Sequence, residues 1–214
     1  MVLLESVFLS VLIGLIAGGR LGRLGGIPLR RGYLIILAAL MQSYVVYSAK
    51  AEIVSGLALP TVILLGSYII LIVACAVNLR LPGMYLVGLG LLLNLTVMTA
   101  NGGYMPISAE QLQAAGFTRE LSQVESYYRL PRSKDVLMPA SEIRLAALSD
   151  VLVLTLPLPL DNRYTRTVMS VGDVLVAVGI FFLAQAGLGS RLALFKLQPV
   201  GRPRSQHSPS STAT

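Results

Sequence analysis

Residues 54–77 read VSGLALPTVILLGSYIILIVACAV, a long apolar run without a charged side chain. A helix needs about 20 mostly apolar residues to cross the hydrocarbon core of a bilayer, so this run predicts a transmembrane helix. Four further apolar runs approach that length, at residues 2–18, 33–49, 84–101 and 168–188. The sequence therefore predicts an all-α membrane protein with a bundle of about five transmembrane helices.

The composition agrees with a membrane protein. The chain has 214 residues, of which 55% are hydrophobic and only 13% are charged, whereas soluble domains carry about 25% charged residues. A net charge of +7 is also typical of nucleic-acid-binding proteins. Here, however, the arginines flank apolar runs instead of covering a soluble domain, so we expect no nucleic acid among the partners.

The basic residues indicate how the chain is oriented. The loop 19–32 has four arginines and no acid, the short loop at Arg80 has one arginine and no acid, and the segment after Leu188 is also basic without acids. Because positive loops stay in the cytoplasm, we expect an N-terminus outside, a cytoplasmic C-terminus and five spans across a bacterial cytoplasmic (inner) membrane. Four arginines are candidate contacts to anionic lipid headgroups: Arg20, Arg23, Arg30 and Arg31.

The sequence also allows two alternatives to this topology. The first run could be a cleaved signal peptide with small residues at 17–19, but it lacks a basic segment in front of it. Residues 143–160 could form a sixth span, but Arg144, Asp150, Pro157 and Pro159 lie within them. Charged residues at a helix centre are costly in lipid, so an interfacial or re-entrant segment is expected there instead.

The predicted division of the chain has four parts. Residues 1–100 form four transmembrane helices, 101–167 a small external helical lid with an interfacial segment, 168–190 the fifth transmembrane helix, and 191–214 a disordered cytoplasmic tail. In the lid, Ser108 is expected to cap a short helix that ends at Gly116. Further short helices are expected at 118–129 and 141–148, and extended or irregular chain at 151–160 because of its two prolines.

Two strings of residues carry a family resemblance. One is TANGGYMPIS at residues 99–108, and the other is SVGDVLVAVGI at residues 170–180, with RLAALSDV at 144–151 between them. In this order the chain resembles the bacterial membrane family catalogued as domain of unknown function fifty-three seventeen, over about residues 1–190. That family usually has Leu-Gly-Asp where this chain has Leu-Ser-Asp at 148–150. The resemblance implies a multi-spanning envelope protein and no particular activity.

Asp173 is the first candidate for a functional group. It lies near the start of the fifth apolar run, with Ser170 one helical turn before it. A carboxylate inside a membrane helix usually faces protein or water, so Asp173 is either a proton or cation site or a helix-start carboxylate that the dipole favours. If it is functional, it should face the bundle near the first or fourth helix, within reach of Asn101 or Glu5.

Other polar residues extend this candidate intramembrane site. Asn94 and Asn101 lie on one face of the fourth helix, and an amide at that depth either links helices by hydrogen bonds or contacts a substrate. Glu5 is expected at the depth of Asp173, where two carboxylates could share a proton or a cation; a helix-end side chain that reaches the water interface is the simpler explanation. Gln42 adds polarity to the second helix.

The sequence lacks the residues of common cofactor and catalytic sites. Cys75 is the only cysteine and lies in an apolar run, and His207 is the only histidine and lies in the polar tail. No His/Cys cluster for zinc or haem and no Ser/His/Asp set can be assembled. We therefore expect neither a metal nor a cofactor.

Three functions remain open at this point. The leading hypothesis is a non-enzymatic accessory, assembly or sensory subunit that acts through a membrane-protein partner. The alternative is a small transporter or channel that forms a homo-oligomer, with a polar cavity that faces outward. The third is a lipid- or polyprenyl-modifying enzyme that uses Asp150 or Asp161, but the chain lacks the acidic clusters that would hold Mg²⁺ against a phosphate.

Overall fold

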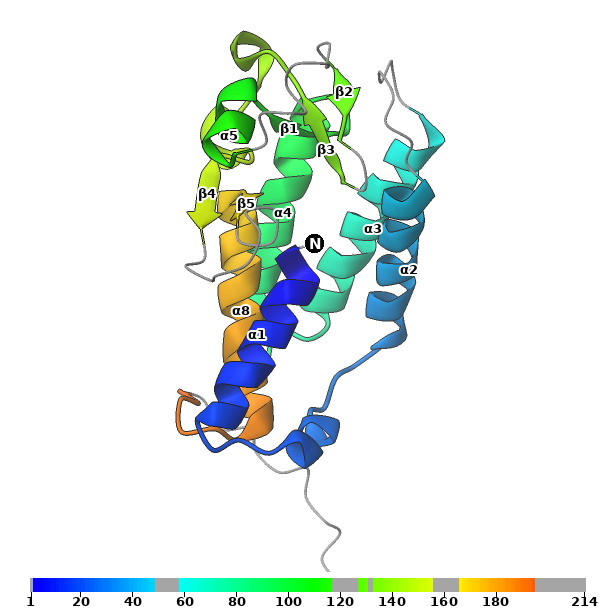
Figure 1. Cartoon of the computed structure of the whole chain (residues 1–214). Coiled ribbons are helices and arrows are strands. Elements are labelled where there is room, and N and C mark those ends of the chain that lie inside the picture. The colour runs from blue at the N-terminus through cyan, green and yellow to red at the C-terminus, as the bar shows by residue number, and fades with distance from the viewer. Residues whose placement is uncertain (1, 49–57, 117–126, 131–132, 156–165, 195–214) are drawn as a thin grey trace, which may run out of the picture.

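The computed structural model describes residues 2–48, 58–116, 127–130, 133–155 and 166–194. It is mostly helical, with a small group of strands gathered at one end of the helices (Figure 1). Each of the five apolar runs contains a helix: α1 (Val2–Ile16), α2 (Tyr33–Ser48), α3 (Leu59–Ala76), α4 (Met84–Ala100) and α8 (Val171–Leu188). By length and composition, α3 and α8 can cross a membrane, whereas α1, α2 and α4 are apolar but shorter.

The five helices pack side by side in the order α1, α8, α4, α3, α2, which differs from their order in the chain. In Figure 1, α1, α3 and α8 run toward the end that holds the short 3₁₀ helix η1 (Leu21–Gly26), and α2 and α4 run back. We call the end with η1 and the predicted arginine loop the arginine end. The opposite end carries the strands and is called the cap end.

The cap is built from short strands and one short helix. A three-stranded sheet has the order β1 (Met105–Ile107), β3 (Asp135–Leu137), β2 (Tyr128–Arg129), with β1 and β3 parallel. A second sheet pairs β4 (Leu152–Thr155) with β5 (Arg166–Met169) in antiparallel register. The all-α prediction is therefore wrong for the cap. Strands of two to four residues are too short to show an alternating pattern, and their pairing depends on contacts between distant segments.

The lid helices agree with the prediction at one position and differ at two. The side chain of Ser108 caps α5 (Ala109–Ala114), and Gly116 follows with a positive φ of 83°, as expected. The helix predicted at 141–148 is instead two 3₁₀ turns, η2 (Ala140–Glu142) and η3 (Ala146–Leu148), because Leu145 between them adopts a φ of 57°.

The other lid segments are described only in part. The end of the helix predicted at 118–129 is strand β2, and its remaining residues up to 126 lie outside the described ones. Residues 143–155 form turns and strand β4 and no spanning helix, whereas 156–160 lie outside the described residues. Extended chain was expected at 151–155, and β4 confirms it.

Helices α4 and α8 approach each other so closely that glycine is required at four positions. A Cβ atom added to Gly83 would lie 2.0 Å from the carbonyl oxygen of Gly179, and one added to Gly172 would lie 2.6 Å from that of Gly90. Real Cβ atoms do not approach backbone atoms so closely, so no larger residue fits without moving a helix. The pair of Gly90 and Gly172 brings the polar side chains of α4 and α8 into contact at the cap end.

Candidate functional site: a buried ion cluster under the cap

Helix α8 begins with a reciprocal pair of hydrogen bonds. The backbone N–H of Asp173 donates to Ser170 Oγ at 2.9 Å, and the backbone N–H of Ser170 donates to Asp173 Oδ2 at 3.4 Å. This capping box satisfies backbone donors that the first turn of a helix leaves unpaired. Asp173 is thus placed at the positive end of the helix dipole, where a carboxylate is favoured.

Asn94 joins this helix start to α4. Its Nδ2 donates to Asp173 Oδ1 at 2.8 Å, and its Oδ1 accepts from Ser170 Oγ at 2.8 Å. All three side chains are buried. The glycine pair of Gly90 and Gly172 lies beside them and explains the close approach, because a Cβ on Gly172 would lie 2.1 Å from Asn94 Oδ1.

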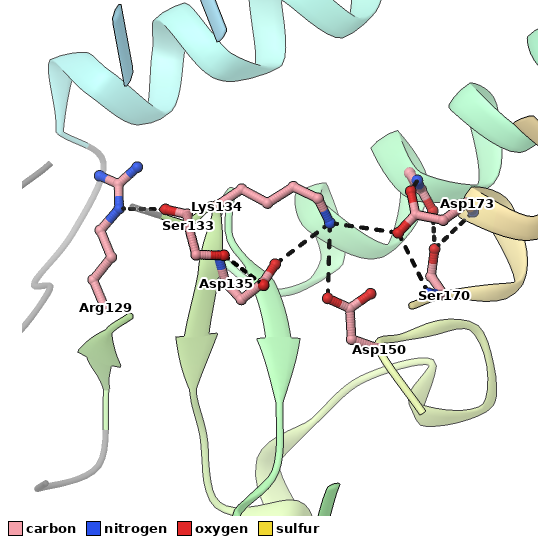
Figure 2. Close-up of polar contacts among 8 residues, drawn as sticks. Arg129, Ser133, Lys134, Asp135, Asp150, Ser170 and Asp173 are labelled. Atoms are coloured by element: carbon pink, nitrogen blue, oxygen red, sulfur yellow. Dashed lines mark hydrogen bonds and ion pairs between the residues drawn. The ribbon is translucent and has the colours of Figure 1, made fainter. Parts of the chain in front are cut away.

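A lysine from the cap reaches into this network. Lys134, in the turn before β3, places its Nζ 3.8 Å from Asp173 Oδ2, 3.7 Å from Asp150 Oδ2 and 3.4 Å from Asp135 Oδ1. Figure 2 shows the lysine side chain extended across the site, with the three carboxylates around its end. Asp135 begins β3, Asp150 follows η3 and Asp173 belongs to α8. The ammonium therefore ties three segments of the chain together.

The cluster is largely shielded from water and its charges do not balance. Asp150 is only 2% exposed, and the side chain of Lys134 is 22% exposed. Oδ1 of Asp150 has no hydrogen-bond partner among the described residues. With all groups ionised, three carboxylates would face one ammonium. Buried charges without compensation are costly, so such a site favours the uptake of a proton or another positive charge.

The pKa values in the cluster show where a proton would go. Burial raises the pKa of the Asp150 carboxyl well above its usual range; the Lys134 ammonium opposes this shift, and Asp135 and Asp173 add to it. For Lys134, burial lowers the pKa, but Asp150, Asp173 and Asp135 outweigh burial and raise it well above its ordinary value. The carboxylates thus favour the charged form of Lys134, whereas burial favours the protonated form of Asp150.

The cap side of the cluster has its own support. Ser133 Oγ donates to Asp135 Oδ2 at 2.5 Å and accepts from the backbone N–H of Asp135. The buried Arg129 of β2 donates from Nε to the carbonyl oxygen of Ser133 at 3.4 Å. Figure 2 shows Arg129 on the far side of this turn from Asp150. From α3, Tyr68 is close enough to contribute to the electrostatics at Lys134.

The structure brings together three of the six predicted intramembrane residues, namely Asp173, Ser170 and Asn94. Asp173 faces α4, but its partner there is Asn94 and not Asn101. Asn101 instead ends α4 and binds the backbone of Arg144, donating to its carbonyl oxygen and accepting from its N–H, both at 2.9 Å. Sequence reasoning did not find Lys134 and Asp135, for which the only signal is a Lys-Asp pair directly before an apolar stretch.

The remaining predicted residues lie elsewhere. Gln42 donates to Ser67 Oγ at 3.2 Å and so links α2 to α3. The side chain of Glu5 lies outside the described residues. The four arginines predicted to contact lipid headgroups are exposed around η1 at the arginine end, far along the helices from the cap (Figure 1). They are Arg20, Arg23, Arg30 and Arg31.

Among the described residues, no group of three or more His, Cys, Asp or Glu side chains is arranged to hold a metal ion.

The profile of a family of unknown function, DUF5317, matches residues 26–185. The chain belongs to the DUF5317 family. The part that matches DUF5317 includes every residue of the ion cluster and both glycine pairs, whereas α1 lies before it.

Neither the curated proteins nor the solved structures contain a match to this DUF5317 chain. At position 149, where the family resemblance predicts glycine, the chain has Ser149. Its backbone has φ −74° and ψ −172°, an extended conformation that any residue adopts. Its hydroxyl donates to the carbonyl oxygen of Ala146 at 2.7 Å. Serine therefore fits this position without strain.

Proposed function

We propose that this DUF5317 protein is a non-enzymatic sensory or accessory subunit of the bacterial cytoplasmic membrane, whose cap is held on the helices by a proton-dependent ion cluster. The observation that carries the proposal is the buried Lys134 ammonium among three carboxylates from the cap and from α8. A partner protein would respond to the cap being held or released.

Five apolar helices support the membrane part of the proposal. The chain crosses the bilayer five times, with the N-terminus and the cap outside and the arginine end in the cytoplasm, as the positive residues of that end indicate. Many large apolar side chains on the helices are exposed, for example Phe8, Leu40, Ile69 and Leu92. Exposure of these side chains to water would be unfavourable, whereas contact with lipid tails is not.

The proton acts through the charge on Asp150. While Asp150 is protonated, Lys134 is shared by two carboxylates and the third group is neutral. A group whose pKa is raised on folding stabilises the folded arrangement while it is protonated, and this stabilisation is lost as the pH rises through the raised pKa. Deprotonation at higher pH therefore adds a buried negative charge beside Asp135 and Asp173 and weakens the contact between cap and helices.

Cysteine accessibility under the cap tests this mechanism. Ser149→Cys, in a Cys75→Ser background, places a thiol at a buried position next to Asp150. Ala147→Cys places a control thiol at an exposed position of η3, and the ratio of the two alkylation rates reports the opening of the cap. We expect this ratio to rise with pH, and to stay low and constant when Asp150→Asn is added.

Two results would contradict the proton-dependent cap. One is a ratio that does not change with pH in the chain that keeps Asp150. The other is the same pH dependence with Asp150 and with Asp150→Asn, because the proton would then be held elsewhere.

Asp173→Asn provides a further test of function. It keeps the shape of the side chain and removes one charge, so it should abolish a cellular phenotype while expression is retained.

The topology and the partner are tested separately. A membrane-impermeant thiol reagent applied to intact cells should label Ala147→Cys and spare Arg20→Cys; the reverse pattern would invert the orientation. Purification in a mild detergent should retain a second protein. A pure homo-oligomer would instead favour a small transporter or channel.

The transporter is the second candidate, because a buried site with excess negative charge is also suited to a moving cation or proton. The pair of Gly90 and Gly172 argues against a path between α4 and α8, since the two backbones meet there directly beside the cluster. Proton flux into vesicles that contain only this protein, lost with Asp173→Asn, would decide for the transporter.

A further inference from the structure

A pocket of about 750 Å³ opens on the cap, separate from the ion cluster. It lies at the point where α4 ends, and none of the cluster residues lines it. The residues whose chemistry matters here are Asn101, Tyr104, Met138, Glu142, Ile143 and Arg144. The sequence motif that resembles the family, around Asn101, thus forms one wall of a cavity.

The wall formed by Asn101 is fixed in place. The Asn101 side chain holds both backbone polar groups of Arg144, and its Nδ2 also donates to the carbonyl oxygen of Val97 at 2.8 Å. Gly102 and Gly103 follow with positive φ values of 71° and 94°, which turn the chain away from the helix. The backbone of Arg144 is therefore attached to the end of α4, and a ligand meets a preformed site there.

The lining combines one cation, one anion and an apolar wall. Arg144 and Glu142 are exposed, and Glu142 also accepts a hydrogen bond from the hydroxyl of Tyr127. Tyr104 and Met138 are buried in one small apolar cluster against which Ile143 packs. Guanidinium groups bind phosphate through paired hydrogen bonds, and a carboxylate two residues away is suited to an ammonium group.

We propose that this pocket binds a phosphate ester that carries an ammonium group, supplied as the headgroup of a zwitterionic phospholipid. Arg144 binds the phosphate, Glu142 binds the ammonium, and the wall of Tyr104 and Met138 contacts the glycerol and the first acyl carbons. The lipid source rests on the proposed function, in which α4 spans the membrane, because the end of a spanning helix lies at the level of the headgroups.

Short-chain lipids test the assignment on the purified full-length protein in mild detergent. The unfolding temperature is followed against the concentration of dihexanoyl-phosphatidylethanolamine, dihexanoyl-phosphatidylglycerol and free phosphoethanolamine, since a ligand that binds the folded state raises it. We expect phosphatidylethanolamine to bind most tightly. Arg144→Gln should weaken its binding by about tenfold, equivalent to about 1.4 kcal/mol. Glu142→Gln should remove its advantage over phosphatidylglycerol.

Arg80→Gln is the matched control, because Arg80 is an exposed arginine at the other end of α4. It should leave all three affinities unchanged. Equal weakening by Arg80→Gln and Arg144→Gln, or no effect of Arg144→Gln, would overturn the site. Binding of free phosphoethanolamine as tight as that of the lipid would overturn the lipid source. The alkylation ratio at position 149 needs no lipid, so failure here is distinguishable from failure of the proton-dependent cap.

Discussion

The two ends of the helical bundle differ in the polar groups that link their neighbouring segments. At the cap end, the contact between α4 and α8 is extended by charged groups: Asp173, Asp150 and Lys134. At the arginine end, buried neutral amides make the corresponding links. Gln185 of α8 donates to the carbonyl oxygen of Ser10 in α1 at 2.8 Å, and Asn78 donates to that of Arg30 at 2.8 Å.

In the proposed mechanism, this difference separates a fixed end from an end that responds to pH. Amide hydrogen bonds do not change between mildly acidic and mildly alkaline conditions, because neither amide titrates there. The charged groups of the arginine end are exposed arginines, which keep their charge at any such pH. Among the described residues, the buried contact that the proposed mechanism makes dependent on protonation lies at the cap end. The following variants test this division, beginning with the largest effect.

Lys134→Met should have the largest effect. It leaves Asp135, Asp150 and Asp173 without their common cation, and loss of one partner from a buried ion pair costs about 3–5 kcal/mol. Because the lysine side chain is 22% exposed, we expect the lower part of that range. Thermal unfolding in mild detergent measures it, with Lys134→Arg as the control that keeps the charge. If Lys134→Met and Lys134→Arg lose the same free energy of unfolding, the positive charge at this position contributes little to stability.

Gly172→Ala should have the next largest effect. Its Cβ would meet the backbone of Gly90 and the Asn94 amide, neither of which can move alone. Overpacking of this kind costs about 1–3 kcal/mol. Gly14→Ala at the contact of α1 with α8 meets only the ends of the Leu188 and Gln185 side chains, so its loss should be smaller. Gly22→Ala, with open space around the new Cβ, is the neutral control.

Gln185→Leu should have a moderate effect that does not depend on pH. It removes the hydrogen bond to Ser10 and leaves the hydroxyl of Ser190 without its acceptor at 2.7 Å. Hydrogen bonds between membrane helices contribute about 0.6–2 kcal/mol. The unfolding temperature should fall equally at mildly acidic and mildly alkaline pH. A loss that grows with pH would mean that the arginine end also titrates.

Gln42→Leu should have the smallest effect. Its one hydrogen bond to Ser67 is 3.2 Å long and half-buried, so we expect a loss near the lower value of about 0.6 kcal/mol. Ser67 keeps its own bond to the carbonyl oxygen of Leu64 in this variant. A much larger loss in the same unfolding assay would show that the contact of α2 with α3 depends on Gln42 more than this one hydrogen bond explains.

The helices were predictable because each long apolar run carries its own signal. The runs at 33–49 and 84–101 match α2 and α4 to within one residue. The strands of the cap carried no such signal, because β1 and β3 consist of three residues each and stabilise one another across a gap in the sequence. Local patterns indicate helices that form within one segment, but they do not indicate pairs of short strands.

The candidate site was predictable on the helices and not in the cap. Asp173 and Asn94 stood out because polar residues in apolar helices are few and usually face protein. Lys134 and Asp135 did not stand out, because charged residues in a polar lid are ordinary. Their role depends on the path of the chain from β2 to β3, which places a loop residue above α8. Only the three-dimensional structure shows that this path ends beside Asp173.

The link between Asn94 and Asp173 also sets the order in which the protein is assembled. These residues lie 79 positions apart in the chain, and synthesis proceeds from the N-terminus. Lys134, Asp135 and Asp150 are therefore made before α8 exists to receive them. The contact of α8 with α4 brings Asp173 to the other charged groups. A nascent chain truncated before α8 thus lacks Asp173, so Lys134 can pair with Asp135 and Asp150 within the cap but cannot yet attach the cap to α8.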